Sequence, residues 1–169
     1  KLSARGRAGR LSSVREFSKY LNARFPESSI LASSLFKVPE TVRFYLFSKQ
    51  EVCQLMKAAE RLGMRDKIRS NCMCFLIGLL YSTGLRISEA LSLTKDDVDL
   101  INLRAFIKKG KFGKQRYVPL DESVAQEFHK WNKVCEQCTS SQENPHIFID
   151  QNGKKLTYGQ VNGTFTLCR

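Results

Sequence analysis

Long hydrophobic runs are missing from this sequence. The longest uninterrupted apolar stretch, Cys72–Tyr81, has ten residues, whereas a membrane-spanning helix needs about 20. Proline and glycine are also sparse, at 4 and 10 of 169 residues, while 42% of the residues are hydrophobic and 26% are charged. These proportions are typical of a globular protein and exclude membrane-spanning, collagen-like and disordered chains.

Acidic residues are nearly absent from two stretches, although the chain as a whole carries 28 Lys+Arg, 16 Asp+Glu and a net charge of +12. Residues 1–25 hold seven basic side chains and one acidic side chain, Glu16, while residues 104–116 hold six basic side chains and no acidic one. Each stretch therefore has a net charge of +6, and the rest of the chain balances to zero. Such a concentration of positive charge favours a polyanionic partner, and nucleic acid is favoured over an anionic membrane.

The cysteines do not indicate a disulfide scaffold or a metal site. Cys72 and Cys74 lie in the most apolar segment, where free thiols act as small hydrophobic groups, so we expect a reducing, intracellular compartment. One Cys-x-x-Cys pair is a weak zinc signal, and we expect no metal at its possible ligands His129, Cys135, Cys138 and His146. Carboxylates at residues 96–99 are expected to cap a turn.

Hydrophobic periodicity predicts a mainly helical α+β fold with a small antiparallel β-sheet. Predicted helices cover residues 10–24, 48–62, 67–82, 87–93, 122–138 and 157 onward, and predicted strands cover residues 103–108, 115–120 and 146–150. Apolar residues surround the helix at 67–82, so we expect it to be buried. Phe128 and Trp131 are expected in the core. A proline- and serine-containing segment places a domain boundary within residues 34–42.

One segment combines an arginine at a helix break with a basic hairpin. Arg86 follows a glycine between two apolar helical segments, where an arginine is costly to bury without an anionic partner. Glu89 lies one helical turn later and can orient the guanidinium, so a structural ion pair and an anion-binding arginine are both open. The loop at residues 110–113 places Lys111 at the tip of a hairpin, where lysines also protect strand edges from aggregation.

Together these motifs resemble the tyrosine recombinase (phage integrase) family. The resemblance lies in Thr83-Gly-Leu-Arg-Ile-Ser-Glu, Leu91-Ser-Leu-Thr-Lys-Asp-Asp-Val-Asp and Lys109-Gly-Lys-Phe-Gly-Lys-Gln-Arg-Tyr-Val-Pro-Leu. It covers nearly the whole chain and implies the recombinase catalytic-domain fold, with residues 37–169 as the amino-terminal part of that domain. Residues 1–36 would be the end of the core-binding (arm) domain and its linker.

The resemblance also implies roles for individual residues. Arg86 would grip the scissile phosphate, Lys111 would donate a proton to the leaving 5′ oxygen, and Glu89 would support Arg86; no metal or cofactor is required. Side chains expected to bind DNA are Arg7, Arg10, Arg15, Lys19, Lys108, Lys109, Lys114 and Arg116. The implied partners are double-stranded DNA at a recombination site and other recombinase protomers, in the bacterial cytoplasm with the nucleoid.

Other parts of the family pattern are missing. Neither His129 nor His146 begins a His-x-x-Arg motif, because Asn132 and Ile149 stand at the fourth positions. Tyr158 precedes the region of the family's tyrosine nucleophile, and we assign it to packing or a helix start. We therefore expect an inactive fragment of an enzyme that breaks and rejoins DNA through a phosphotyrosine intermediate. The alternatives are a DNA-binding remnant or regulator without catalysis, and a basic helical protein that binds other acidic surfaces.

Overall fold

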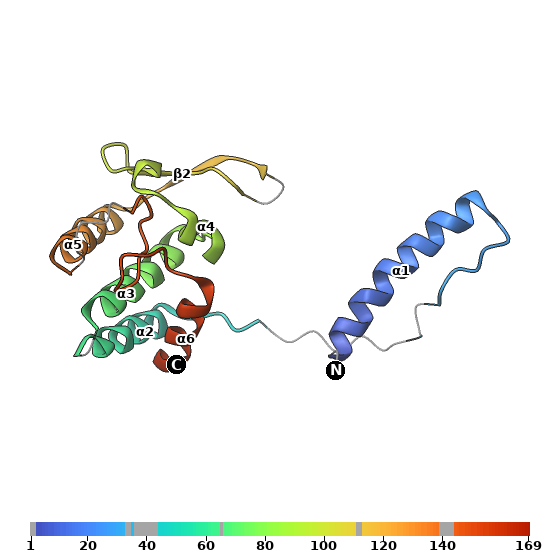
Figure 1. Cartoon of the computed structure of the whole chain (residues 1–169), viewed down its shortest axis with the longest axis horizontal. Coiled ribbons are helices and arrows are strands. Elements are labelled where there is room, and N and C mark those ends of the chain that lie inside the picture. Colours follow the sequence, from blue (N-terminus) through green and yellow to red (C-terminus); the bar gives the residue numbers. More distant parts are fainter. Residues whose placement is uncertain (1–2, 33–34, 36–43, 65, 111–112, 139–143) are drawn as a thin grey trace. The chain divides into compact units, whose positions relative to one another are not determined.

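The chain forms two compact units, Lys1–Leu46 and Phe47–Arg169. The computed structural model describes residues 3–32, 35, 44–64, 66–110, 113–138 and 144–169 (Figure 1). The domain division predicted between residues 36 and 37 lies outside the described residues and stays a prediction.

The first unit is built on one long helix, α1 (Ala4–Arg24). It begins six residues before the predicted helix, because the Ser3 side chain accepts a hydrogen bond from the Gly6 N–H at 3.1 Å and caps the helix. Val14 and Phe17 belong to the apolar stripe of α1, yet they are 52% and 59% exposed. The described part of this unit therefore leaves much of the stripe uncovered.

The second unit is organised around α3 (Lys67–Thr83), which packs against α2 (Lys49–Arg61) and α5 (Glu122–Cys138), as Figure 1 shows. The predicted burial of α3 is confirmed. Its buried side chains are Ile68, Ser70, Cys72, Met73, Phe75, Leu76, Ile77 and Leu79. Neighbours on several sides explain why apolar residues surround this helix. A capping box between Ser48 and Glu51 begins α2, in agreement with the predicted start of this helix.

Aromatic side chains from three segments meet in the core of the second unit. The Phe75 ring lies 5.9 Å from that of Phe128 and 5.3 Å from that of Phe148, between centroids. Trp131 is 2% exposed, and its Nε1–H donates a hydrogen bond to the Ile147 carbonyl at 2.7 Å. The core positions predicted for Phe128 and Trp131 are confirmed.

A three-stranded antiparallel sheet lies at one edge of this unit (Figure 1). Phe106 pairs with Tyr117 and Ile107 with Arg116 across the second and third strands. Because side chains alternate along a strand, the buried Ile107 shares a face with Arg116, while Phe106 and Tyr117 lie on the opposite face. The strands are β1 (Val98–Asp99), β2 (Arg104–Ile107) and β3 (Arg116–Pro119).

Two predicted elements differ from the structure. The strand predicted at residues 146–150 is wrong: this segment forms isolated bridges from His146 to Thr94 and from Ile149 to Lys155, because its backbone pairs with two different segments in turn. The turn expected at residues 96–99 is replaced by a short 3₁₀ helix and by β1. The last helix, α6 (Tyr158–Cys168), begins after a capping box at Thr157, in agreement with the prediction.

Candidate functional site

The junction between α3 and α4 (Ile87–Ser92) places Arg86. Gly84 ends α3 in the left-handed conformation, with φ of 64°, and its N–H donates to the Leu80 carbonyl at 3.0 Å. Leu85 is 6% exposed and anchors the connection in the core. Arg86 then adopts an extended backbone as the N-cap of α4. A glycine, a buried leucine and a helix start therefore fix the position from which the Arg86 side chain leaves the backbone.

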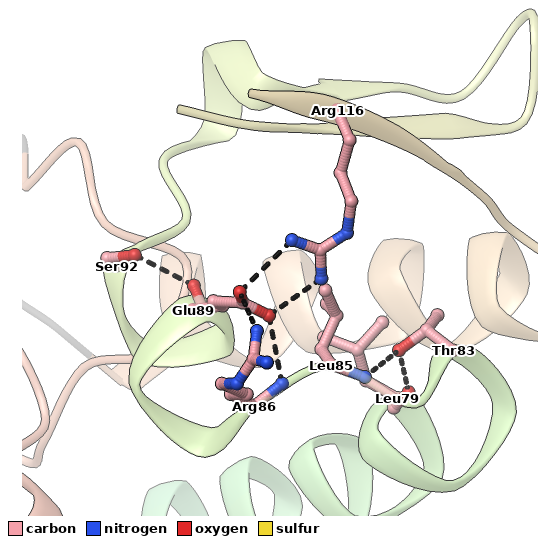
Figure 2. A network of polar contacts seen from close by, with 7 residues as sticks. All are labelled: Leu79, Thr83, Leu85, Arg86, Glu89, Ser92 and Arg116. Carbon is pink, nitrogen blue, oxygen red and sulfur yellow. Dashed lines mark hydrogen bonds and ion pairs between the residues drawn. The ribbon is translucent and has the colours of Figure 1, made fainter. Parts of the chain in front are cut away.

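The Glu89 carboxylate is the centre of a polar network at this junction (Figure 2). Oε2 accepts hydrogen bonds from the Arg86 backbone N–H at 3.0 Å and from Arg116 Nη2 at 2.8 Å. Oε1 accepts from Arg86 Nη1 at 3.0 Å and from Arg116 Nη1 at 3.1 Å. Only 3% of the Glu89 side chain is exposed. Two guanidinium groups thus share one buried carboxylate, and Arg116 binds it through both terminal nitrogens.

The network keeps Glu89 ionised. Hydrogen bonds from the Arg116 side chain lower the pKa of Glu89 most, and hydrogen bonds from the Arg86 backbone and side chain lower it further. Burial of the carboxylate acts in the opposite direction, but the hydrogen bonds outweigh it, and the pKa of Glu89 falls to about 2. At neutral pH the cluster of one carboxylate and two guanidiniums therefore carries one net positive charge.

Arg86 stays accessible although it is paired. Its side chain is 56% exposed, and Nη1 donates to Glu89. A guanidinium has five N–H donors, so most of its donors remain available to a second oxyanion. The structural ion pair and the anion-binding arginine, which the sequence left open, are therefore compatible: Glu89 orients Arg86 while part of the guanidinium faces solvent.

The basic hairpin begins and ends close to this cluster. The Gly110 N–H donates to the Lys114 carbonyl at 2.9 Å, and the Gly113 N–H donates to the Gly110 carbonyl at 3.1 Å. Gly113 has a φ of 72°, a left-handed conformation that favours glycine. The predicted proton donor, Lys111, lies outside the described residues, so its assignment stays a prediction.

Three of the five basic side chains that the structure describes in residues 104–116 have a carboxylate partner. Arg104 pairs with Asp99 at 3.1 Å, Lys108 with the buried Asp97 at 2.7 Å, and Arg116 with Glu89. The basic pattern of the sequence predicts Lys108 and Arg116 as DNA contacts but reveals neither carboxylate partner, because no local spacing connects residues so far apart. Their DNA contacts remain predictions. Lys109 and Lys114 are exposed, and among the described residues no carboxylate lies within ion-pair distance of either.

The DNA-binding residues predicted in the first unit lie along α1. Arg7 and Arg10 are exposed and three residues apart, so they share a side of the helix. Arg15 and Lys19 form a second pair on another side of the helix. Because each residue turns the helix by about 100°, Arg15 lies roughly 140° around the helix axis from Arg10. Lys19 also binds Glu16 at 2.8 Å. The four residues are thus divided between two sides of α1.

Neither a metal cluster nor a membrane span occurs in the part of the chain that the structure describes. No group of three or more His, Cys, Asp and Glu side chains is placed to hold a metal ion there; the Cys138 side chain lies outside that part. Asp97 instead accepts hydrogen bonds from the Thr94 backbone and side chain at 2.9 and 2.7 Å, which is the capping role predicted for it. None of the described helices combines the length and hydrophobicity that crossing a bilayer requires.

Comparisons with known proteins agree with the resemblance seen in the sequence. The profile described as the phage integrase family matches residues 46–168. A putative integrase/recombinase, y4rB of Sinorhizobium fredii, is 35% identical over 163 residues, covering 94% of this chain and 52% of that protein. Tyrosine recombinase XerC of Bacillus subtilis is 30% identical, covering 92% of this chain and 51% of that protein. The structure of the Tn1549 transposon integrase in complex with circular intermediate DNA superimposes with a TM-score of 0.71 at 19% identity, covering 99% of this chain and 57% of that one.

Proposed function

The chain belongs to the phage integrase family, and from this membership and the geometry around Arg86 we propose that it is part of a site-specific DNA recombinase. The chain spans about half the length of the curated relatives that it matches. The proposed activity is therefore that of the whole protein, which would break and rejoin DNA strands through a phosphotyrosine intermediate. Its partners would be a double-stranded recombination site and further protomers bound to that site. As a DNA-acting enzyme it would reside with the nucleoid in the cytoplasm.

The observation that carries this proposal is the accessible guanidinium of Arg86 held by a buried carboxylate. Phosphodiester cleavage builds negative charge on the non-bridging phosphate oxygens, and a donor that is already in position stabilises this charge without having to reorganise. Glu89 provides that preorganisation through two hydrogen bonds to Arg86. By the family resemblance, Lys111 would protonate the leaving 5′ oxygen as a general acid.

Strand cleavage tests the proposal. The full-length wild-type protein would first select its preferred duplex from a random-sequence pool. A nick is then placed in that duplex beside the cleavage position. Cleavage releases a short DNA fragment that diffuses away, and the strand cannot be rejoined, so the covalent protein–DNA complex accumulates. We expect such a complex to form without added metal. A protein that binds the selected duplex but never forms the complex would instead be the DNA-binding remnant or regulator.

Duplex binding by the chain should depend steeply on salt. If its basic side chains neutralise five to eight phosphates, the logarithm of the association constant should fall against the logarithm of the salt concentration with a slope of about −4 to −7. Fluorescence anisotropy of a labelled duplex between low and physiological salt measures this slope. Replacing the exposed Lys114 with glutamine should reduce the slope by about 1. A slope near zero would contradict a phosphate-binding role for the two basic stretches.

A further inference from the structure

Both strands of the basic hairpin are held by buried carboxylates at the base of its loop. Lys108, which follows β2, binds Asp97 at 2.7 Å, and Arg116, the first residue of β3, binds Glu89 at 2.8 Å. The Asp97 and Glu89 side chains are 4% and 3% exposed. Each of these buried carboxylates requires its cation, because removing one partner of a buried ion pair is strongly destabilising.

Gly110, where the loop begins, also packs directly against the Arg116 guanidinium. A Cβ atom added at Gly110 would lie 2.6 Å from the Lys114 carbonyl oxygen and 3.0 Å from Arg116 Nη1. The same added Cβ atom would lie 3.7 Å from Glu89 Oε1. Only a residue without a side chain fits here, so Gly110, the first residue of the loop, packs closely against the Arg116–Glu89 pair.

From these contacts we propose that Arg116 is a positioning residue, which fixes the base of the hairpin loop relative to Arg86 through the shared Glu89 carboxylate. The inference rests on the proposed function, since the position of the loop matters only if Arg86 acts on a phosphate. One carboxylate thereby couples two chain segments, the start of α4 and the start of β3. Arg116 acts through Glu89 and does not contact the DNA.

The hydrogen bonds of Arg116 distinguish this role from a phosphate contact. Both of its terminal nitrogens donate to Glu89, one to each carboxylate oxygen. Turning the guanidinium toward DNA would break this two-bond pairing and leave the buried carboxylate with Arg86 alone. Lysine cannot reproduce the planar pairing of arginine with a carboxylate, so a change to lysine keeps the charge but removes the anchor.

A double-mutant cycle in the full-length protein tests the coupling. Arg116→Gln and Glu89→Gln should each lower the single-turnover rate constant for cleavage of the nicked duplex by about 10- to 100-fold, because a misplacement of about 1 Å can cost that much. The double variant should be no slower than Glu89→Gln alone, since Glu89→Gln already removes the Arg116 pairing together with the Arg86 pairing. Arg116→Lys should remain slow. Effects that multiply, or full rescue by lysine, would overturn the proposal.

Two further measurements separate positioning from binding and from general stability. The salt slope of duplex binding should stay the same in Arg116→Gln, and a slope reduced by about 1 would identify a phosphate contact and overturn the inference. Hydrogen exchange of peptides covering residues 104–119 should become faster in Arg116→Gln but not in Arg104→Gln, which removes an exposed pair from the same hairpin. The exchange measurement does not require the protein to cleave DNA. If the wild-type protein cleaves no DNA, the proposed function fails, and unchanged exchange in Arg116→Gln would still overturn the anchor.

Discussion

Replacing Arg86 with alanine should lower the rate constant of DNA strand cleavage by the full-length protein by about 10³-fold, a loss typical of removing one preorganised donor to a developing oxyanion. The reason lies in the geometry of the site. Glu89 holds the guanidinium through the backbone and side chain of Arg86, and 56% of the Arg86 side chain is exposed to an incoming phosphate. Single-turnover cleavage of the nicked duplex measures the effect directly.

The same variant should bind the duplex nearly as well as the wild type, because Arg86 would supply one of several phosphate contacts. Arg61→Ala is the matched control, since it removes an exposed arginine from the last turn of α2 and should leave cleavage unchanged. Comparable losses of binding and cleavage in Arg86→Ala would make Arg86 an ordinary DNA contact. A near-normal cleavage rate would refute its role in catalysis.

Much of the fold could be predicted from the sequence because its signals are local. Capping residues such as Ser48 and Thr157 satisfy N–H groups within one turn of their own helices, so their spacing predicts where α2 and α6 begin. Gly84 ends α3 for an equally local reason, the left-handed conformation that favours glycine. The Arg86–Glu89 pair was also predictable, because residues three apart on a helix are neighbours.

Contacts between distant segments were not predictable in this way. Arg116 is 27 residues from Glu89, and the pair forms only because the β2–β3 register places Arg116 on the same face of the sheet as the buried Ile107. The basic pattern alone therefore assigned Arg116 to DNA, a contact that stays a prediction, and did not reveal the carboxylate that its guanidinium binds. The strand predicted at residues 146–150 failed for a related reason, since hydrophobic pattern does not reveal which backbone a segment will pair with.

The folding stability of the chain should fall in acid partly because of Glu89. The pKa of this carboxylate lies at about 2 in the folded chain against an ordinary value of 4.5. A lowered pKa stabilises the folded state fully above the unfolded value, so this stabilisation is lost as the pH falls from about 4.5 towards 2. The shift corresponds to about 3 kcal/mol at most, and because Arg86 and Arg116 are themselves half-exposed, solvent screening reduces the contribution to about 2 kcal/mol.

Glu89→Gln should therefore lower the free energy of unfolding by about 2 kcal/mol at pH 7, and its difference from the wild type should shrink by more than half by pH 3. Urea unfolding followed by the fluorescence of Trp131, the single tryptophan, measures both values.

The pKa of Asp97 is also lowered, since hydrogen bonds from Lys108 and Thr94 outweigh the effect of burial. This shift is common to the wild type and Glu89→Gln and cancels in the comparison. Glu136→Gln, at an exposed position on α5, is the control and should unfold like the wild type at each pH. A constant difference between Glu89→Gln and the wild type from pH 7 to pH 3 would show that ionisation of the carboxylate does not stabilise the junction.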